Sequence, residues 1–125
     1  MTDRKFDLEN RLIDFGVLSI KTAELLPKSF AGNHLSGQLV RSGTSPALQY
    51  GEAVSAESRN DFIHKMKIAL KELRETHNCL KIIERIKWLE DERITSNIKE
   101  CNELISIFVK SISTAQKNRL LNKEK

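Results

Sequence analysis

The sequence lacks the features that mark several classes of protein. Its 125 residues include only 2 prolines, 5 glycines and 2 cysteines, and aromatic residues make up 6% of the chain. This composition excludes collagen-like and low-complexity chains, while a hydrophobic fraction of 39% excludes a disordered one. Apolar stretches such as Leu104–Val109 are far shorter than the ~20 residues that span a bilayer. No signal-peptide pattern opens the sequence, so we expect a cytoplasmic protein with reduced thiols and no membrane partner.

Charge is balanced along most of the chain and basic at its C-terminal end. The formal net charge is +4, and residues 110–125 hold five basic groups and one acidic group, so 5 − 1 = +4. The preceding 109 residues are therefore neutral overall. The basic tail, residues 117–125, has two interpretations: a solubilising terminus, or a loose contact with polyanions.

The only clear periodicity is helical. Apolar residues recur at alternating steps of four and three from Phe62 to Ile83 and again from Ile94 to Ala115. This heptad spacing is typical of helices that pack along a seam. The sequence therefore predicts an all-α fold.

Local signals set the expected helix boundaries. Pro27 ends a first helix, and Asn33 is the expected N-cap of a second. Pro46 lies inside that second helix, where we expect a kink and not a break. Ser58 and Asp61 form a capping box for the third helix. We predict helices over 7–26, 33–55, 59–86 and 91–118, packed as an antiparallel up-down-up-down four-helix bundle in one domain.

Catalytic and metal-binding patterns are absent from the sequence. No Glu-x-x-His pair occurs, His34, His64 and His77 stand apart, and no glycine-rich phosphate loop is present. Cys101 is expected to act as a small hydrophobe, whereas Cys79 can react only if it is exposed near a base. We expect no enzymatic activity, no metal and no cofactor.

A row of cations follows the third helix. Its members, here called the cation row, are Lys67, Lys71, Arg74, Lys81 and Arg85. Their spacing places them on one side of the helix, with Asp61, Glu72 and Glu75 on another flank. The cation row either follows a nucleic-acid backbone, at roughly one counterion-releasing contact per cation, or pairs with acids of a neighbouring helix or subunit.

The small polar residues before Pro46 also have two interpretations. Ser42, Thr44 and Ser45 accompany Arg41 in the second helix. They form either a packing notch between helices or subunits, or a site in which Arg41 and hydroxyl groups hold an anion. In the packing interpretation Arg41 forms a buried ion pair, for which the candidate partners are Glu52, Glu72 and Glu75.

Three linked motifs resemble the bacterial four helix bundle protein family. They are Gln38–Ser45 with Glu52-Ala53, Ala56–Lys65, and Ile68–Thr76. This family includes proteins encoded by intervening sequences in 23S rRNA genes, and the chain is more distantly similar to the accessory variability proteins of diversity-generating retroelements. The chain departs from the family at two positions: Gln49 stands where relatives usually have Asn, and Pro46 stands where they have an aliphatic or small residue.

The resemblance implies a four-helix bundle that self-associates as a ring, commonly a pentamer. The retroelement relatives resemble basic accessory proteins that bind RNA and a reverse transcriptase. Together with the cation row, this predicts a non-enzymatic accessory protein that binds RNA or another nucleic acid. The alternative function is a protein-interaction scaffold without nucleic-acid affinity.

Overall fold

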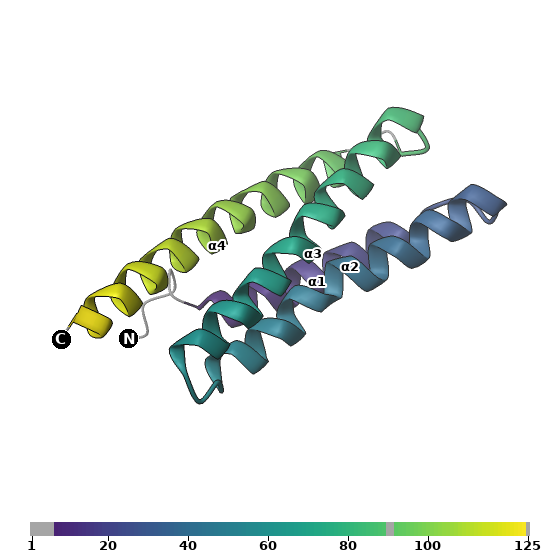
Figure 1. Cartoon of the computed structure of the whole chain (residues 1–125). Coiled ribbons are helices and arrows are strands. Elements are labelled where there is room, and N and C mark those ends of the chain that lie inside the picture. The colour runs from purple at the N-terminus through teal and green to yellow at the C-terminus, as the bar shows by residue number, and fades with distance from the viewer. Residues whose placement is uncertain (1–6, 90–91, 125) are drawn as a thin grey trace.

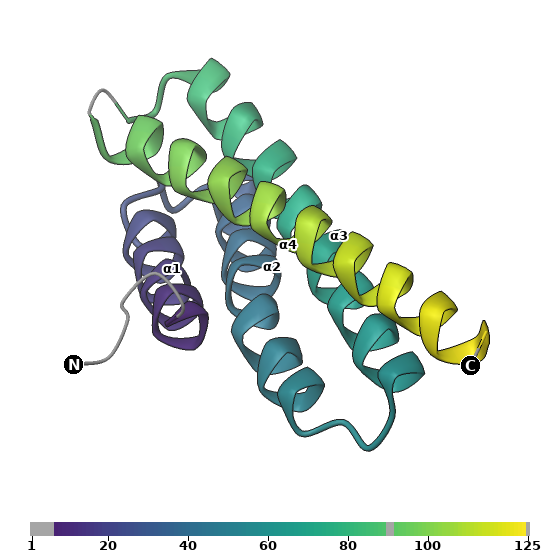
Figure 2. The ribbon, with the colours of Figure 1, turned by 90° about the vertical axis from the view of Figure 1, so that its left-hand side faces the viewer.

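The computed structural model describes residues 7–89 and 92–124, with the side chains of the last helix described up to Leu121. The four helices are α1 (Leu8–Ala23), α2 (Phe30–Val54), α3 (Arg59–Ile86) and α4 (Glu92–Glu124). Each packs against the next in an antiparallel arrangement, and α1 packs only lightly against α4 (Figures 1 and 2). The prediction of an all-α four-helix bundle is confirmed.

Side-chain caps explain where three of the helices begin. The Asp7 carboxylate accepts a hydrogen bond from the Asn10 amide, and the Ser58 hydroxyl accepts one from the Asp61 amide at 3.0 Å. The expected cap at Asn33 is wrong. Ser29 is the N-cap of α2, because its extended backbone lets its hydroxyl accept a hydrogen bond from the Gly32 amide at 3.0 Å.

The helices differ in length more than the sequence predicts. The first helix ends at Ala23, three residues before the expected boundary, and α4 continues to Glu124, past the expected residue 118. The second helix runs unbroken through Pro46, which is buried. Of the basic tail, residues up to 124 belong to α4, while the side chains of Lys123 and Lys125 lie outside the described residues.

The apolar stripes of the sequence form the core, with shifts at their edges. In α3, Ile63 is buried in place of Phe62, which is half-buried. In α4, Leu104 and Asn97 are buried, while Ile98 and Ile105 of the predicted stripe are only partly buried at the margin of the core. A heptad stripe predicts one face of a helix, but the crossing of neighbouring helices decides which flank of that face is covered.

A buried polar pair links α1 to α4. The Asn97 side chain is fully buried and its amide nitrogen donates a hydrogen bond to the Thr22 hydroxyl at 3.2 Å. The Asn97 carbonyl oxygen has no partner. Because a buried amide costs free energy when it is unpaired, this pair favours one register between the two helices.

Small residues bring α1 and α2 close together. A Cβ atom added at Gly43 would lie 2.5 Å from both Cβ and Oγ of Ser19, and one added at Gly16 would lie 3.6 Å from Thr44. Ser19 is fully buried. The α1–α2 contact therefore depends on the absence of a side chain at Gly43.

Candidate nucleic-acid interface

The cation row lies along the outer side of α3. Lys67, Lys71, Arg74 and Arg85 are exposed and Lys81 is half-buried. The row extends over about 27 Å, at 1.5 Å of rise per residue. Within residues 7–89 and 92–121, none of its five members forms an ion pair. These cations therefore form a line of positive charge along α3 that is interrupted at Asn78.

Two acids on the other flank of α3, Glu72 and Glu75, face α2 and are already paired. The Arg41 guanidinium contacts Glu72 through Nη1 at 2.9 Å and Glu75 through Nη2 at 2.8 Å. The hydrogen bond to Glu72 is the largest cause that raises the pKa of Arg41 above its usual value. Arg41 thus bridges α2 to two successive turns of α3.

Two sequence expectations about Arg41 need correction. Its side chain is 50% exposed, so the expected burial of the ion pair is wrong. Glu52 does not pair with Arg41, because it lies beside Lys65 and accepts a hydrogen bond from that ammonium at 2.7 Å. This contact raises the pKa of Lys65.

The hydroxyls near Arg41 bond to their own helix. Ser42 donates to the Gln38 carbonyl at 3.0 Å, and Thr44 donates to the Val40 carbonyl at 2.7 Å. Ser42 is fully buried and Ser45 is half-buried. These contacts direct the hydroxyl protons into the helix and not toward a shared anion.

A shallow hollow of about 360 Å³ lies within the cation row. It is lined by Lys67, Leu70, Lys71, Arg74, Glu75 and Asn78. Three of these residues are cations and Asn78 offers a neutral amide. The hollow has the chemistry for phosphate groups, since ammonium and guanidinium groups both donate hydrogen bonds to them.

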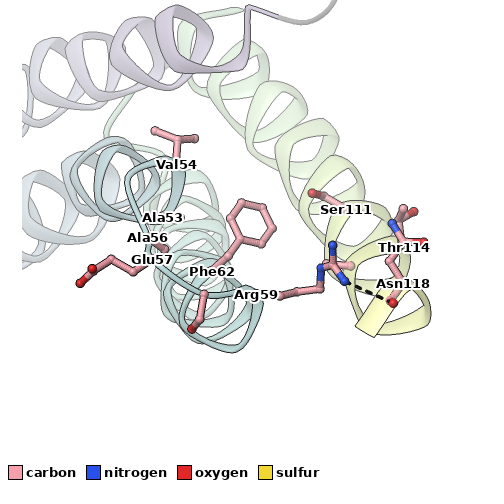
Figure 3. Close-up of a pocket in the computed structure, with 11 residues that line it drawn as sticks. Ala53, Val54, Ala56, Glu57, Arg59, Phe62, Ser111, Thr114 and Asn118 are labelled. Carbon is pink, nitrogen blue, oxygen red and sulfur yellow. Dashed lines mark hydrogen bonds between the residues drawn. The ribbon is translucent and has the colours of Figure 1, made fainter. Parts of the chain in front are cut away.

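Sequence reasoning missed a larger hollow of about 740 Å³ at one end of the bundle. Figure 3 shows the Phe62 ring projecting into it between the α2–α3 corner and α4. Arg59 crosses toward α4 and donates a hydrogen bond to the Asn118 carbonyl at 3.3 Å. None of the lining residues comes from α1. The first helix is shorter than the other three and does not reach this end of the bundle.

The cysteines and histidines do not form a reactive cluster. Burial raises the pKa of Cys79 to about 11 and is the main cause that raises the pKa of Cys101 to about 12, so both thiols stay protonated at neutral pH. In the described part of the chain, no three His, Cys, Asp or Glu side chains gather where they could hold a metal ion. Nor is any helix there long and apolar enough to cross a membrane.

Comparison with known proteins adds two findings. Residues 4–110 match the family model described as "23S rRNA-intervening sequence protein". The fold is similar to the crystal structure of a protein of unknown function from the S23 ribosomal protein family of Bacteroides thetaiotaomicron VPI-5482. The TM-score is 0.76 at 32% identity, and the match covers 83% of this chain and 96% of the other. No curated protein matches the chain.

Proposed function

The chain belongs to the family of 23S rRNA-intervening sequence proteins, and from that premise we propose that it is a non-enzymatic accessory protein that binds RNA through the cation row. The observation that carries this proposal is the exposure of the row without an ion pair among the described residues. The family description refers to ribosomal RNA, and the solved relative is assigned to a ribosomal protein family. RNA is therefore the polyanion to test first.

The chemistry of the row favours recognition of the backbone over recognition of bases. Its members are cations interrupted by Asn78 and not by an aromatic ring. Proteins that bind single strands by stacking place aromatic side chains among their basic groups. We therefore propose salt-sensitive binding of structured RNA with weak sequence preference.

The test is the binding of a labelled structured RNA to the whole chain between 50 and 200 mM salt, with duplex DNA alongside. If all five cations displace counterions, affinity falls by roughly several hundred-fold over that range. Replacing Lys67, Lys71 and Arg74 by Glu should weaken binding by about 100-fold or more at the lower salt. The helical circular dichroism signal should be unchanged, because all three side chains are exposed.

A matched control variant separates the effect of the cation row on RNA affinity from the effect of the net charge of the protein. Lys28→Glu, Lys99→Glu and Lys110→Glu together change the net charge equally at three exposed positions outside the row. The proposal expects this control to lose much less affinity than the variant in the row. Equal losses, or no binding by the unmodified chain at 50 mM salt, would favour the scaffold function without nucleic-acid affinity.

We also propose that the protein self-associates as a homo-oligomer through the outer faces of α1 and α2. Ile13, Val17 and Leu48 are 47%, 45% and 68% exposed. The only charged residues of α2 are Arg41 and Glu52, and both pair with α3. A second copy can cover the α2 part of this face at little cost in charge desolvation. A ring of five is the assembly to test, and repetition of the cation row around it would strengthen a weak contact.

Native mass measurement tests this assembly. The unmodified chain should have a multiple of the 14.3 kDa monomer mass, five-fold for a pentamer. Val17→Glu should lower the assembly mass, because it places a charge in the proposed interface. A monomeric unmodified chain at micromolar concentration contradicts self-association and leaves the proposal on RNA standing.

A further inference from the structure

The cation row has an acid at its edge. Glu75 lines the same hollow as Lys67, Lys71 and Arg74. It also follows Lys71 by four residues, a spacing at which lysine and glutamate side chains meet on a helix surface. A carboxylate free to turn toward these cations would compete with phosphate for them.

The structure directs this carboxylate away from the row. The Glu75 side chain accepts hydrogen bonds from Arg41 at 2.8 Å and from Gln38 at 3.4 Å, both of which belong to α2. The same guanidinium holds Glu72 at 2.9 Å. Arginine suits this contact because its planar fork can donate to two acceptors in fixed directions, which a lysine ammonium does less well.

We infer that Arg41 is a positioning residue for nucleic-acid binding, which keeps Lys67, Lys71 and Arg74 available by holding Glu72 and Glu75 on the α2 side. This inference rests on the proposed RNA-binding function. Without Arg41, Glu75 pairs with Lys71, and RNA must displace that carboxylate before a phosphate can bind. An exposed ion pair of this kind weakens binding by about 2- to 5-fold, and the salt dependence decreases by about one counterion.

The experiment compares three variants of the whole chain in the same RNA titration. Arg41→Gln should weaken binding and reduce the slope of log affinity against log salt. Arg41→Gln combined with Glu72→Gln and Glu75→Gln should restore both, since the competing carboxylates are gone. Arg41→Gln combined with Glu9→Gln and Glu24→Gln is the control, because it has the same net charge as the variant with Glu72→Gln and Glu75→Gln. Its two glutamine substitutions lie at exposed positions of the α1 segment, remote from the row in sequence. It should remain weak.

The outcomes separate the inference from the function on which it rests. Binding by the unmodified chain together with full binding by Arg41→Gln overturns the inference and leaves the function intact. Failure of the Glu72 and Glu75 changes to restore binding also overturns it, because Arg41 then contacts RNA itself or supports the fold. Absence of binding by the unmodified chain overturns the function as well.

A fourth variant, together with measurements of folding, tests for loss of structure. Arg41→Lys keeps the positive charge and loses the fork, so one carboxylate is released and the loss of affinity should lie between those of the unmodified chain and Arg41→Gln. Circular dichroism and the thermal midpoint of each variant show whether the bundle is intact. Arg41→Lys binding as weakly as Arg41→Gln, with the bundle intact, contradicts the expectation that a positive charge at position 41 still holds one of the two carboxylates.

Discussion

The second and third helices are neighbours with opposite compositions. Arg41 and Glu52 are the only charged residues among the 25 of α2, whereas 11 of the 28 residues of α3 are charged. The second helix also contains four of the five glycines of the chain. It contributes close packing against α1, while α3 contributes a charged outer surface. Both charged residues of α2 form ion pairs with α3: Arg41 contacts Glu72 and Glu75, and Glu52 contacts Lys65.

This difference indicates how the bundle separates stability from surface chemistry. The close approach of α1 and α2 depends on buried small residues, so substitutions there should act on folding. The outer side of α3 carries exposed cations, so substitutions there should act on binding and leave folding nearly unchanged. Each of the following predictions tests one side of that contrast.

The largest effect is expected where α2 meets α1. Gly43→Val places side-chain atoms where Ser19 already lies, only 2.5 Å from the new Cβ. We expect a loss of about 2–3 kcal/mol in the free energy of unfolding, because the helices must separate or the side chains must leave their preferred rotamers. Urea denaturation measures it. An unchanged unfolding midpoint would show that the α1–α2 contact is looser than its geometry implies.

A substitution at an exposed glycine of the same helix should instead increase the free energy of unfolding. Gly37 is exposed, and a Cβ atom added there meets nothing within 4 Å. Gly37→Ala should therefore raise the free energy of unfolding by about 0.5–1 kcal/mol, because glycine costs conformational entropy inside a helix. The same denaturation experiment measures this gain. A loss at Gly37 would mean that this outer face is already covered, as in a self-associated form.

The smallest effect on the native protein at neutral pH is expected from Cys79, which lies between α2 and α3. Cys79 is buried on α3, and its thiol points to the Leu35 carbonyl of α2 at 3.8 Å. With a pKa of about 11 for Cys79 and about 12 for Cys101, a thiol-specific reagent at pH 8 should react slowly until the protein unfolds. Fast labelling of the native protein would show that α2 and α3 separate.

The raised pKa values of Cys79 and Cys101 also determine how the stability of the protein changes with pH. The unfolded thiols lose their protons near the ordinary pKa of 9.0, and the folded ones only near 11 and 12. The folded state therefore binds more protons above pH 9, and the contribution of these thiols to stability falls as pH rises from 9 to about 12. Replacing both cysteines by alanine removes this contribution, which thermal unfolding across that pH range can detect.

Prediction from sequence worked best where the apolar period was regular. The third helix was expected over 59–86 and occupies Arg59–Ile86. Helix boundaries in the first half of the chain were harder to predict. The second helix contains few strong apolar positions, and apolar periodicity cannot identify the residue that caps its N-terminus. Ser29 and Asn33 are both good N-caps, and the structure selects Ser29 because the chain has turned there after Pro27.

The sequence was less informative about which apolar side chains are covered. Ile13, Val17 and Ile20 lie next to the core positions of α1, yet all three are exposed. In α4 the core includes Asn97, a polar residue that no apolar pattern can identify. Burial depends on the rotation of each helix about its axis relative to its neighbours, and that rotation is a property of the packed bundle.

The candidate site also has some features that the sequence determines and others that only the packed bundle determines. The sequence alone determined the helical class, the bundle and the alignment of the cation row, because helical periodicity is local and needs no partner. Only the tertiary structure decided that the row lacks ion pairs among the described residues, that Arg41 takes Glu72 and Glu75, and that Glu52 takes Lys65. The physical reason is that an ion pair between helices forms within about 4 Å. The close packing of small and large side chains sets the rotation and offset of the helices, and these decide which charges come within that distance.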